Sequence, residues 1–267
     1  MSVLIFNPML NLSSLFYSFV VCVKVPQSCK HMMLGFAFTL VLLVALLGSP
    51  GLGQLSEINT TNSNVQQQIV DMHNEIRREI SASNMLRMNW SSEISANAQK
   101  WADTCAMGHS TQSKRTVGNI ICGENIYMSS HPDPWSSAIN AWNSEKEFYT
   151  YSQSVNWNAV GHFTQMIWRR TNEVGCGVAH CPSNSSAQYF YVCHYSPPGN
   201  FRGQYPYKRG PHCADCPDSC EDDLCNNPCP HFDHYANCRS VVNNIGCRLS
   251  LIRAFCPASC LCKGEID

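Results

Sequence analysis

The distribution of cysteine constrains the fold of this chain more than any other feature of its sequence. The chain has 267 residues and 17 cysteines, of which two lie before residue 30, five between residues 105 and 193, and ten between residues 213 and 262. Cytosolic proteins rarely carry so many cysteines, so disulfides or metal clusters must account for them. The distribution predicts a module of ordinary core composition followed by a small cysteine-dense one. Because 17 is odd, at least one sulfur has no partner within the chain.

Residues 1–53 are predicted to lie outside the folded protein. The stretch Met32–Leu47 is apolar, has a basic flank and is followed by small residues, which is the pattern of a secretory signal peptide cleaved after Gly53. Its apolar core is shorter than the about 20 residues that a membrane-spanning helix needs. Residues 1–31 would then be an upstream extension before the true start of translation. The alternative is a membrane anchor within residues 1–25.

A secreted chain gives meaning to triplets of the form Asn-X-Ser/Thr, which accept N-linked glycans. Three such sequons begin at Asn59, Asn89 and Asn184, and we expect a glycoprotein. The formal net charge is −1, so the chain lacks the excess of positive charge that binding to nucleic acid requires. We therefore expect no nucleic-acid partner. The secreted location also favours disulfides over metal clusters.

The first module, residues 54–204, shows the spacings of both helices and strands. Apolar residues at intervals of three and four predict amphipathic helices, and short runs rich in β-branched and aromatic residues predict strands. Helices are predicted at residues 65–80, 92–104 and 135–148, and strands at residues 166–168, 177–180 and 188–194. Because the elements alternate without the rhythm of a parallel sheet, we expect an α+β fold with helices on both faces of a mainly antiparallel sheet.

Several motifs of this module resemble the CAP superfamily: His73–Arg78 (HNEIRR), Cys122–Met128 (CGENIYM), Gly161–Trp168 (GHFTQMIW), and Tyr189–Tyr195 (YFYVCHY) with Pro198–Asn200. The cysteine-dense block narrows the resemblance to the cysteine-rich secretory proteins, through Cys213–Cys220, Leu224–Cys229 and Cys256–Cys262. The resemblance implies a CAP α-β-α sandwich at residues 54–204 and a linker with a cystine hinge at residues 205–228. It implies a short-helix domain at residues 229–267 that resembles the sea-anemone potassium-channel toxin fold.

The resemblance also implies how the cysteines pair. It leaves Cys122 as a free thiol, because Ser196 stands where the family has the partner cysteine. We expect this thiol to be buried and inert, and pairing with another molecule is the alternative. A zinc cluster is the alternative for the later cysteines, but oxidation in a secreted chain competes for the thiolates. The implied disulfides are Cys105–Cys181, Cys176–Cys193, Cys213–Cys220, Cys216–Cys225, Cys229–Cys262, Cys238–Cys256 and Cys247–Cys260.

Four residues match the CAP cleft by their place in the motifs: His109, Glu124, Glu145 and His162. Imidazole nitrogen binds Zn²⁺, and a carboxylate that accepts the other ring N–H fixes the tautomer. The resemblance implies the two histidines as metal ligands, with the glutamates in an outer shell around them. Two ligands make an incomplete site, so we expect weak zinc binding. The alternatives are a purely structural role and metal-dependent hydrolysis.

No catalytic residue is assigned, because the chain has no nucleophile motif such as G-x-S-x-G. We therefore expect a protein that is not an enzyme, and a metal-dependent protease is the least favoured function.

The terminal domain is predicted to present aromatic and arginine side chains to a partner. Its resemblance to channel-directed toxins implies regulation of extracellular ion channels. Pore-blocking relatives place a lysine beside an aromatic residue, whereas this chain has arginines there, so we expect modulation of gating. The alternative is a cystine scaffold that binds another surface protein. The expected surface consists of Phe232, Tyr235, Arg248, Arg253 and Phe255.

These features predict a secreted binding protein that is monomeric or weakly oligomeric. The family resemblance implies reproductive or salivary secretions, roles in sperm maturation and fertilisation, and ion channels or sperm and cell-surface proteins as partners. The alternative is a protein centred on the CAP module that binds sterol or lipid or acts in innate defence.

Overall fold

The computed structural model describes residues 57–266, except residues 154–155, 232 and 236. The chain divides into two units between Gly53 and Gln54, and the described residues all belong to the second unit. The predicted signal peptide, the upstream extension with its two cysteines, and Phe232 lie outside the described residues. Among the residues that are described, no helix is long and apolar enough to cross a membrane.

A four-stranded sheet forms the centre of the first module. Its strands lie in the order β1 (Asn89–Trp90), β5 (Glu173–His180), β6 (Tyr189–Ser196) and β4 (Gly123–Ser129). β1 pairs with β5 in parallel, and the pairs β5–β6 and β4–β6 are antiparallel. The sheet is therefore mainly antiparallel, as predicted.

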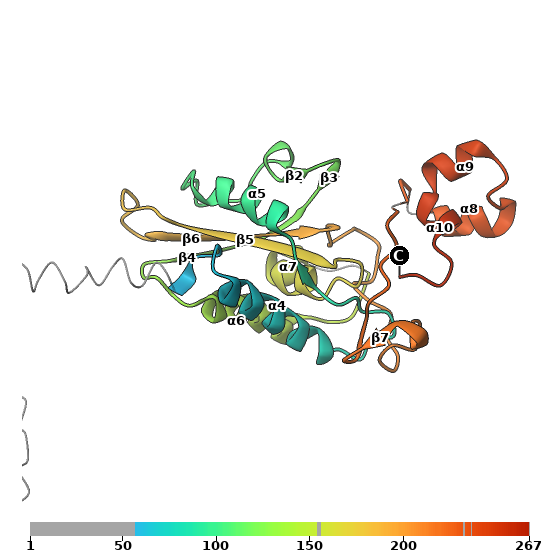
Figure 1. Cartoon of the computed structure of the whole chain (residues 1–267), viewed down its shortest axis with the longest axis horizontal. Helices are drawn as coiled ribbons and strands as arrows, with labels where there is room; N and C mark the ends of the chain where they lie inside the picture. The colour runs from blue at the N-terminus through green and yellow to red at the C-terminus, as the bar shows by residue number, and fades with distance from the viewer. Residues whose placement is uncertain (1–56, 154–155, 232, 236, 267) are drawn as a thin grey trace, which may run out of the picture. The chain divides into compact units, whose positions relative to one another are not determined.

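Helices cover both faces of this sheet (Figure 1). Helix α5 (Ser92–Ala102) lies on one face, and α4 (Ser63–Arg78), α6 (Trp135–Ser144) and α7 (Trp157–Met166) lie on the other. The remaining elements of the first module are short: the hairpin β2 (Thr116–Val117) with β3 (Ile120–Ile121), and the 3₁₀ turns η2 (Gln112–Lys114) and η3 (Glu145–Phe148). The expected α-β-α sandwich is confirmed.

Strand β6 shows why the sheet carries two separate cores. Successive side chains of a strand point to opposite faces. Tyr191 and Tyr195 belong to the cluster formed with α4, α6 and α7, whereas Phe190 and Val192 belong to the cluster formed with α5. Every residue of β6 is buried, and the residues from Tyr189 to Cys193 are apolar or aromatic on both faces, so they form an uninterrupted run in the sequence.

Two glycines of β5 allow the backbone of α5 to lie directly on the sheet. A Cβ atom at Gly175 would lie 2.6 Å from the carbonyl carbon of Ile94, and one at Gly177 would lie 2.6 Å from the backbone nitrogen of Gln99. Contacts this short with backbone atoms cannot be relieved by a change of rotamer. Both positions therefore require glycine because of the close approach of the helix.

We expect Gly177→Ala to lower the free energy of unfolding by about 1–3 kcal/mol, because the new methyl group forces α5 away from the sheet. Urea unfolding at neutral pH measures this change. Gly108→Ala is the matched control, since a Cβ atom there would meet nothing nearer than the carbonyl oxygen of Ala106 at 3.8 Å. Equal stability of the two variants would show that the close approach does not hold in solution.

The predicted strand at residues 166–168 is wrong. Met166 is the last residue of α7, and Ile167 is the residue at its C-terminal end. The side chains of Met166, Ile167 and Trp168 are fully buried, so they form an apolar run whatever their backbone conformation. A run this short does not distinguish the end of a buried helix from a buried strand.

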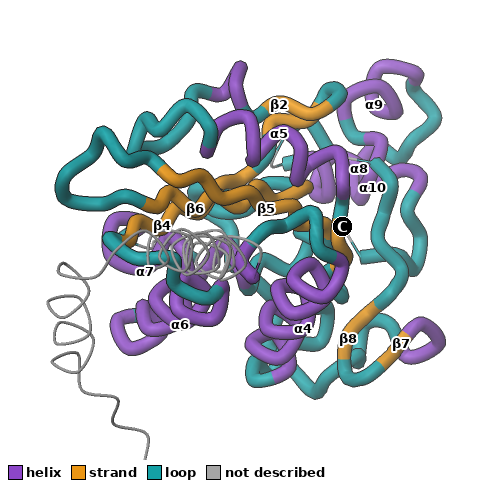
Figure 2. The backbone as a smooth tube through the Cα atoms, turned by 60° about the vertical axis from the view of Figure 1, so that its left-hand side comes forward, coloured by secondary structure: helices purple, strands orange, loops and turns teal. Residues whose placement is uncertain are grey.

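The cystine hinge attaches to the first module through backbone hydrogen bonds. It contains the 3₁₀ turn η4 (Pro217–Ser219) and the short hairpin of β7 (Cys220–Glu221) and β8 (Leu224–Cys225), which Figure 2 shows beyond α4. The N–H of Cys225 donates to the carbonyl of Met85, and its carbonyl accepts from the N–H of Arg87, both at 2.8 Å. The hinge thus continues the backbone pairing of the first module.

Three short helices form the terminal domain: α8 (Cys238–Ile245), α9 (Ser250–Phe255) and α10 (Pro257–Leu261). Their common core consists of cystine sulfur with few aliphatic side chains. In this core Ile252 packs against Cys238 and Cys256. A module of this size cannot bury enough apolar surface to be stable by itself, and disulfides compensate.

The structure contains seven disulfides within the described residues, and they are the pairs that the family resemblance implies. They are Cys105–Cys181, Cys176–Cys193, Cys213–Cys220, Cys216–Cys225, Cys229–Cys262, Cys238–Cys256 and Cys247–Cys260.

Candidate functional site

The first half of the candidate site is a histidine held by a buried carboxylate. His109 lies in the loop after α5, and Glu124 lies on β4. Nδ1 of His109 is 2.7 Å from Oε1 of Glu124, which also accepts from the backbone N–H of Ser110 at 2.8 Å. The carboxylate side chain is only 2% exposed, whereas the imidazole is 59% exposed. The buried group therefore orients a ring that solutes can reach.

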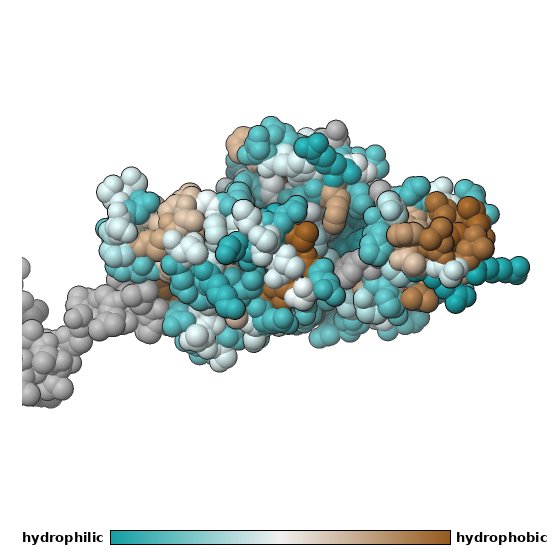
Figure 3. All heavy atoms as spheres, turned by 90° about the horizontal axis from the view of Figure 1, so that it is seen from above, coloured by the Kyte–Doolittle hydropathy of each residue, from teal (hydrophilic) through white to brown (hydrophobic). Residues whose placement is uncertain are grey.

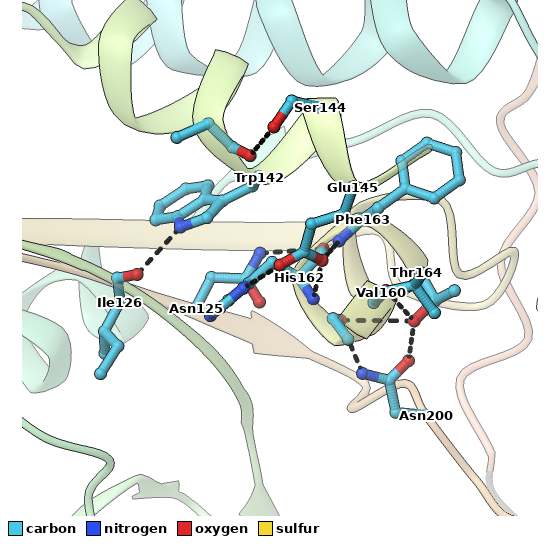
Figure 4. A network of polar contacts seen from close by, with 12 residues as sticks. Asn125, Ile126, Trp142, Ser144, Glu145, Val160, His162, Phe163, Thr164 and Asn200 are labelled. Atoms are coloured by element: carbon cyan, nitrogen blue, oxygen red, sulfur yellow. Dashed lines mark hydrogen bonds and ion pairs between the residues drawn. The ribbon is translucent and has the colours of Figure 1, made fainter. Parts of the chain in front are cut away.

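The second half repeats this arrangement with different elements. His162 lies on α7, and Glu145 is the first residue of η3. Nδ1 of His162 is 2.6 Å from Oε1 of Glu145, while Oε2 of Glu145 accepts from the backbone N–H groups of His162 and Phe163 at 2.9 and 3.0 Å. Figure 4 shows this carboxylate bridging side chain and backbone of the same helix. The glutamate thus fixes both the ring and the turn that carries it.

The two imidazoles face each other. Their centroids lie 6.3 Å apart with an angle of 21° between the ring planes, and Trp142 flanks His162 at 6.3 Å on a nearly parallel plane. The structure therefore brings together His109, Glu124, Glu145 and His162, which come from four different segments of the sequence. A neutral imidazole whose Nδ1–H donates to a carboxylate keeps an unprotonated Nε2, which is the form that binds a metal.

A third histidine lies behind this pair, and sequence analysis did not identify it. His194 on β6 is fully buried; its Nε2 is 3.0 Å from Oε2 of Glu124, and its Nδ1 is 2.8 Å from Oδ1 of Asn97. The amide of Asn97 donates through Nδ2 to the carbonyl of Lys114, so its oxygen faces the ring. Both ring nitrogens of His194 therefore face oxygen atoms, which fix the orientation of the ring against the carboxylate of Glu124.

Glu124 is consequently held in its charged form. Burial by itself raises the pKa of a carboxyl group, but hydrogen bonds from His109, His194 and Ser110 stabilise the carboxylate and bring the pKa of Glu124 well below its usual range. The alternation of β6 is the one signal in the sequence for His194, because it places position 194 on the same face as Phe190 and Val192, under α5.

A chain of buried polar groups connects this site to helix α4. The amide of Asn125 on β4 donates to the backbone carbonyl of His162 at 3.1 Å and to the hydroxyl of Tyr195 at 3.3 Å. That hydroxyl lies 3.0 Å from Nε2 of His73, whose Nδ1 lies 2.7 Å from the carbonyl of Ile69. Because a carbonyl can only accept, His73 donates from Nδ1 and accepts from Tyr195.

The donor set at the paired imidazoles suits zinc better than the clustered cysteines do. Within the described residues, the groups of three ligand atoms that lie within 4.8 Å of one another are Cys213, Cys216 and Cys225, and Cys229 and Cys262 with Glu265. All five sulfurs belong to disulfides and cannot act as thiolates. The two imidazoles would supply ring nitrogen to a bound Zn²⁺, because a carboxylate holds Nδ1 of each ring.

Cys122 is the free cysteine among the described residues, and it is buried. Burial raises the pKa of its thiol to about 11, so it is a poor nucleophile at neutral pH. In the β4–β6 ladder Gly123 lies opposite Tyr195, so one further step of the same register sets Cys122 opposite Ser196. The register explains why the family pairs these two positions and why this chain leaves one sulfur unpaired.

We expect Ser196→Cys to form a disulfide with Cys122 and to raise the free energy of unfolding by about 2 kcal/mol, because the bridge restricts the unfolded chain. Denaturant unfolding with and without reductant measures the gain, and mass spectrometry of the digested protein identifies the pair. Ser196→Cys combined with Cys122→Ala is the control and should show no gain. A pair that involves another cysteine would contradict the register.

The structure also places the predicted sequons and partner surface. Asn59 and Asn89 are exposed, and Asn184 is partly exposed in a turn in which its side-chain oxygen accepts from Ser186 and Ala187. In the terminal domain the ring centroids of Tyr235 and Phe255 lie 5.5 Å apart. The four described residues of the expected surface are all exposed: Tyr235, Arg248, Arg253 and Phe255.

Comparison with known proteins agrees with this architecture. The cysteine-rich secretory protein family model named CAP matches residues 70–195, and the model named Crisp matches residues 213–267. Cysteine-rich secretory protein 1 of Mus musculus is 45% identical over 219 residues, which cover 80% of this chain and 89% of that protein.

Solved structures match part of this chain. The crystal structure of NaASP2 with Zn²⁺ has a TM-score of 0.52 at 28% identity, covering 62% of this chain and 96% of that chain. The crystal structure of Na-ASP-1 has a TM-score of 0.52 at 31% identity, covering 61% of this chain and 47% of that chain. These matches agree with a CAP sandwich, and the model named Crisp covers a separate cysteine-rich region after it.

Proposed function

Because the chain belongs to the cysteine-rich secretory protein family, we propose that it is a secreted, non-enzymatic binding protein that regulates ion channels or other cell-surface partners. The terminal domain is the proposed effector, and the paired imidazoles of the first module are a proposed weak zinc site. Reproductive or salivary secretions are the proposed setting. Binding of sterol or lipid by residues 54–204 stays a prediction.

The observation that supports a partner-binding role is the exposure of aromatic and cationic side chains on the terminal domain. Tyr235 is 56% exposed and Phe255 is 41% exposed, although aromatic side chains are normally buried. Arg248 and Arg253 are exposed near them in the sequence. Aromatic and arginine side chains contribute most of the binding energy at protein interfaces.

Patch-clamp recording from cells that carry calcium- or potassium-selective channels tests this role, with the full chain added from outside. The full chain should change the voltage or kinetics of gating, and Tyr235→Ser with Arg248→Gln should remove the effect. Arg202→Gln in the first module is the control. An effect that survives the double substitution would exclude the aromatic and arginine surface as its source.

The contacts of the site histidines bear on nucleophilic hydrolysis. Within the described residues, the bonds of His109, His162 and His194 go to carboxylates and to an amide, and none joins them to a serine, threonine or cysteine side chain. Nucleophilic hydrolysis needs such a contact between a nucleophile and a base.

Zinc binding should depend on both imidazoles and on the carboxylates that orient them. Calorimetric titration of zinc chloride into the full chain should give a single weak site, and His109→Ala with His162→Ala should abolish its heat. Glu145→Gln should weaken the affinity about tenfold or more, as is typical when a carboxylate behind a ligand is lost. His131→Ala, at an exposed histidine outside the site, is the control. Equal heats for the wild type and the double variant would exclude this site.

A further inference from the structure

The terminal domain exposes an unusual number of large apolar side chains. Among the described residues eleven large apolar side chains are exposed, and six of them lie in this domain. Figure 3 shows a broad hydrophobic area at the right-hand end, where Figure 1 places α8, α9 and α10. We call these six residues the apolar patch: Tyr235, Ile245, Leu249, Leu251, Phe255 and Leu261.

The local structure of α9 shows that these side chains are not needed for the core. Ile252 points inward and is 8% exposed, whereas Leu251 is 65% exposed and lies four residues before Phe255, on the same outer side of the helix. Leu249, which precedes the helix, is 57% exposed. Cystines supply the internal stability of the domain, so polar residues at these outer positions would serve the fold equally well. Concentrated apolar exposure of this kind marks an interaction surface.

The sequence that carries the apolar patch has more basic than acidic residues. No aspartate or glutamate occurs between Asp233 and Glu265, whereas the same interval contains Arg239, Arg248, Arg253 and Lys263. Arg253 donates from Nε to the carbonyl of Cys247 at 2.7 Å, which holds its guanidinium next to the segment that carries Arg248 and Leu249. The acidic residues of the hinge all lie outside this interval. The patch therefore combines exposed aliphatic side chains with a local excess of positive charge.

We propose that the apolar patch docks on a lipid bilayer that contains anionic phospholipid. Aliphatic and aromatic side chains enter the boundary between headgroups and acyl chains, while arginine and lysine side chains remain among the negative headgroups. A bilayer accepts scattered aliphatic side chains without a matching groove, whereas a protein partner must supply one. Docking of this kind would hold the terminal domain at the surface in which channels lie, but it does not depend on any channel.

Vesicle binding tests the proposal directly, with the full chain and two kinds of vesicle. The protein should sediment with vesicles of phosphatidylcholine and phosphatidylserine, and at least tenfold less with vesicles of phosphatidylcholine alone. Added salt should weaken the binding, because it screens the arginines from the headgroups. Binding to neither kind of vesicle would overturn the proposal.

Matched variants separate this patch from the rest of the surface. Leu249→Ser with Leu251→Ser should reduce binding to the anionic vesicles at least tenfold without a change in fold, since neither side chain belongs to the buried core. Met128→Ser with Phe148→Ser removes two exposed apolar side chains of the first module and should leave binding unchanged. Equal loss in the two double variants would overturn the proposal.

A reporter at the patch gives an independent readout. Leu251→Trp should show a blue-shifted emission with anionic vesicles and quenching by brominated acyl chains, because the ring enters the bilayer. An emission that does not change would overturn the proposal. The vesicles contain no protein, so this assay does not depend on any channel. If the protein changed channel gating but did not bind vesicles, docking on the bilayer would be refuted and the proposed function would stand.

Discussion

Arg77→Leu should lower the free energy of unfolding by about 3–5 kcal/mol, the largest loss that we expect from a single substitution in this chain. The guanidinium is fully buried and donates to three backbone carbonyls, those of Leu86, Met166 and Trp168. Two of these carbonyls lie at the end of α7, the helix that carries His162. Leucine would fill part of the space but would leave buried acceptors without donors, which is the costly outcome for hydrogen-bonded groups.

The charge on Arg77 has no carboxylate partner among its hydrogen bonds. Backbone carbonyl groups accept these bonds instead. Burial lowers the pKa of Arg77 to about 9, so the side chain is still charged at neutral pH. The negative end of the α7 dipole, where Met166 lies, compensates part of this charge.

The neighbouring residue is a matched control for Arg77. Arg78 follows on the same helix, but its side chain is partly exposed and pairs with the exposed Asp222 at 2.6 Å. Exposed pairs of this kind contribute about 0–1 kcal/mol, so Arg78→Leu should have little effect on urea unfolding at neutral pH. Equal losses for the two variants would contradict the role given to the buried carbonyl contacts.

Acid should destabilise the protein through His73, the second large effect that we expect. Burial lowers the pKa of His73 to about 4, against 6.5 for an exposed imidazole. Between these two values the unfolded chain binds a proton that the folded protein does not, so stability falls as the pH falls. The loss is about 1.4 kcal/mol for each pH unit, or about 3 kcal/mol between pH 6.5 and pH 4. Above this window both states are neutral at His73 and the contribution does not change with pH.

Denaturant unfolding at a series of pH values measures this slope. His73→Gln keeps a donor and an acceptor but does not titrate. Between pH 6.5 and pH 4 the free energy of unfolding of this variant should therefore change less with pH, and the difference in slope should correspond to close to one proton. Both proteins share every other titrating group, including Glu124, so the difference between their slopes isolates His73. Identical slopes would show that His73 is protonated in the folded protein and would contradict the hydrogen bond from Tyr195.

Local patterns in the sequence predicted the elements whose apolar residues face one way. Helix α4 was expected at residues 65–80 and occupies Ser63–Arg78, because its apolar spacing reports a single buried side. The stretch Met166–Trp168 was misassigned, because a fully buried run has no spacing that separates helix from strand. Strand β4 was not predicted, because Asn125 is its one buried residue and the others are partly covered or, at Met128, exposed.

The candidate site could be predicted as a set of residues but not as a network. The motifs supplied His109, Glu124, Glu145 and His162, which the structure brings together. His194 was missed because its partners, Asn97 and Glu124, lie on α5 and β4, far from it in the sequence. Only the fold shows that its ring meets two acceptors.

We propose that His109 and His162 donate from Nδ1 to Glu124 and Glu145 and present their Nε2 atoms to a divalent metal. Nitrogen-15 spectra of the imidazole rings at neutral pH, recorded before and after addition of zinc chloride, test it most directly. We expect Nδ1–H tautomers for both residues and a shift of both Nε2 resonances on addition of zinc. Nε2–H tautomers in the free protein, or Nε2 resonances that zinc leaves unchanged, would contradict the claim.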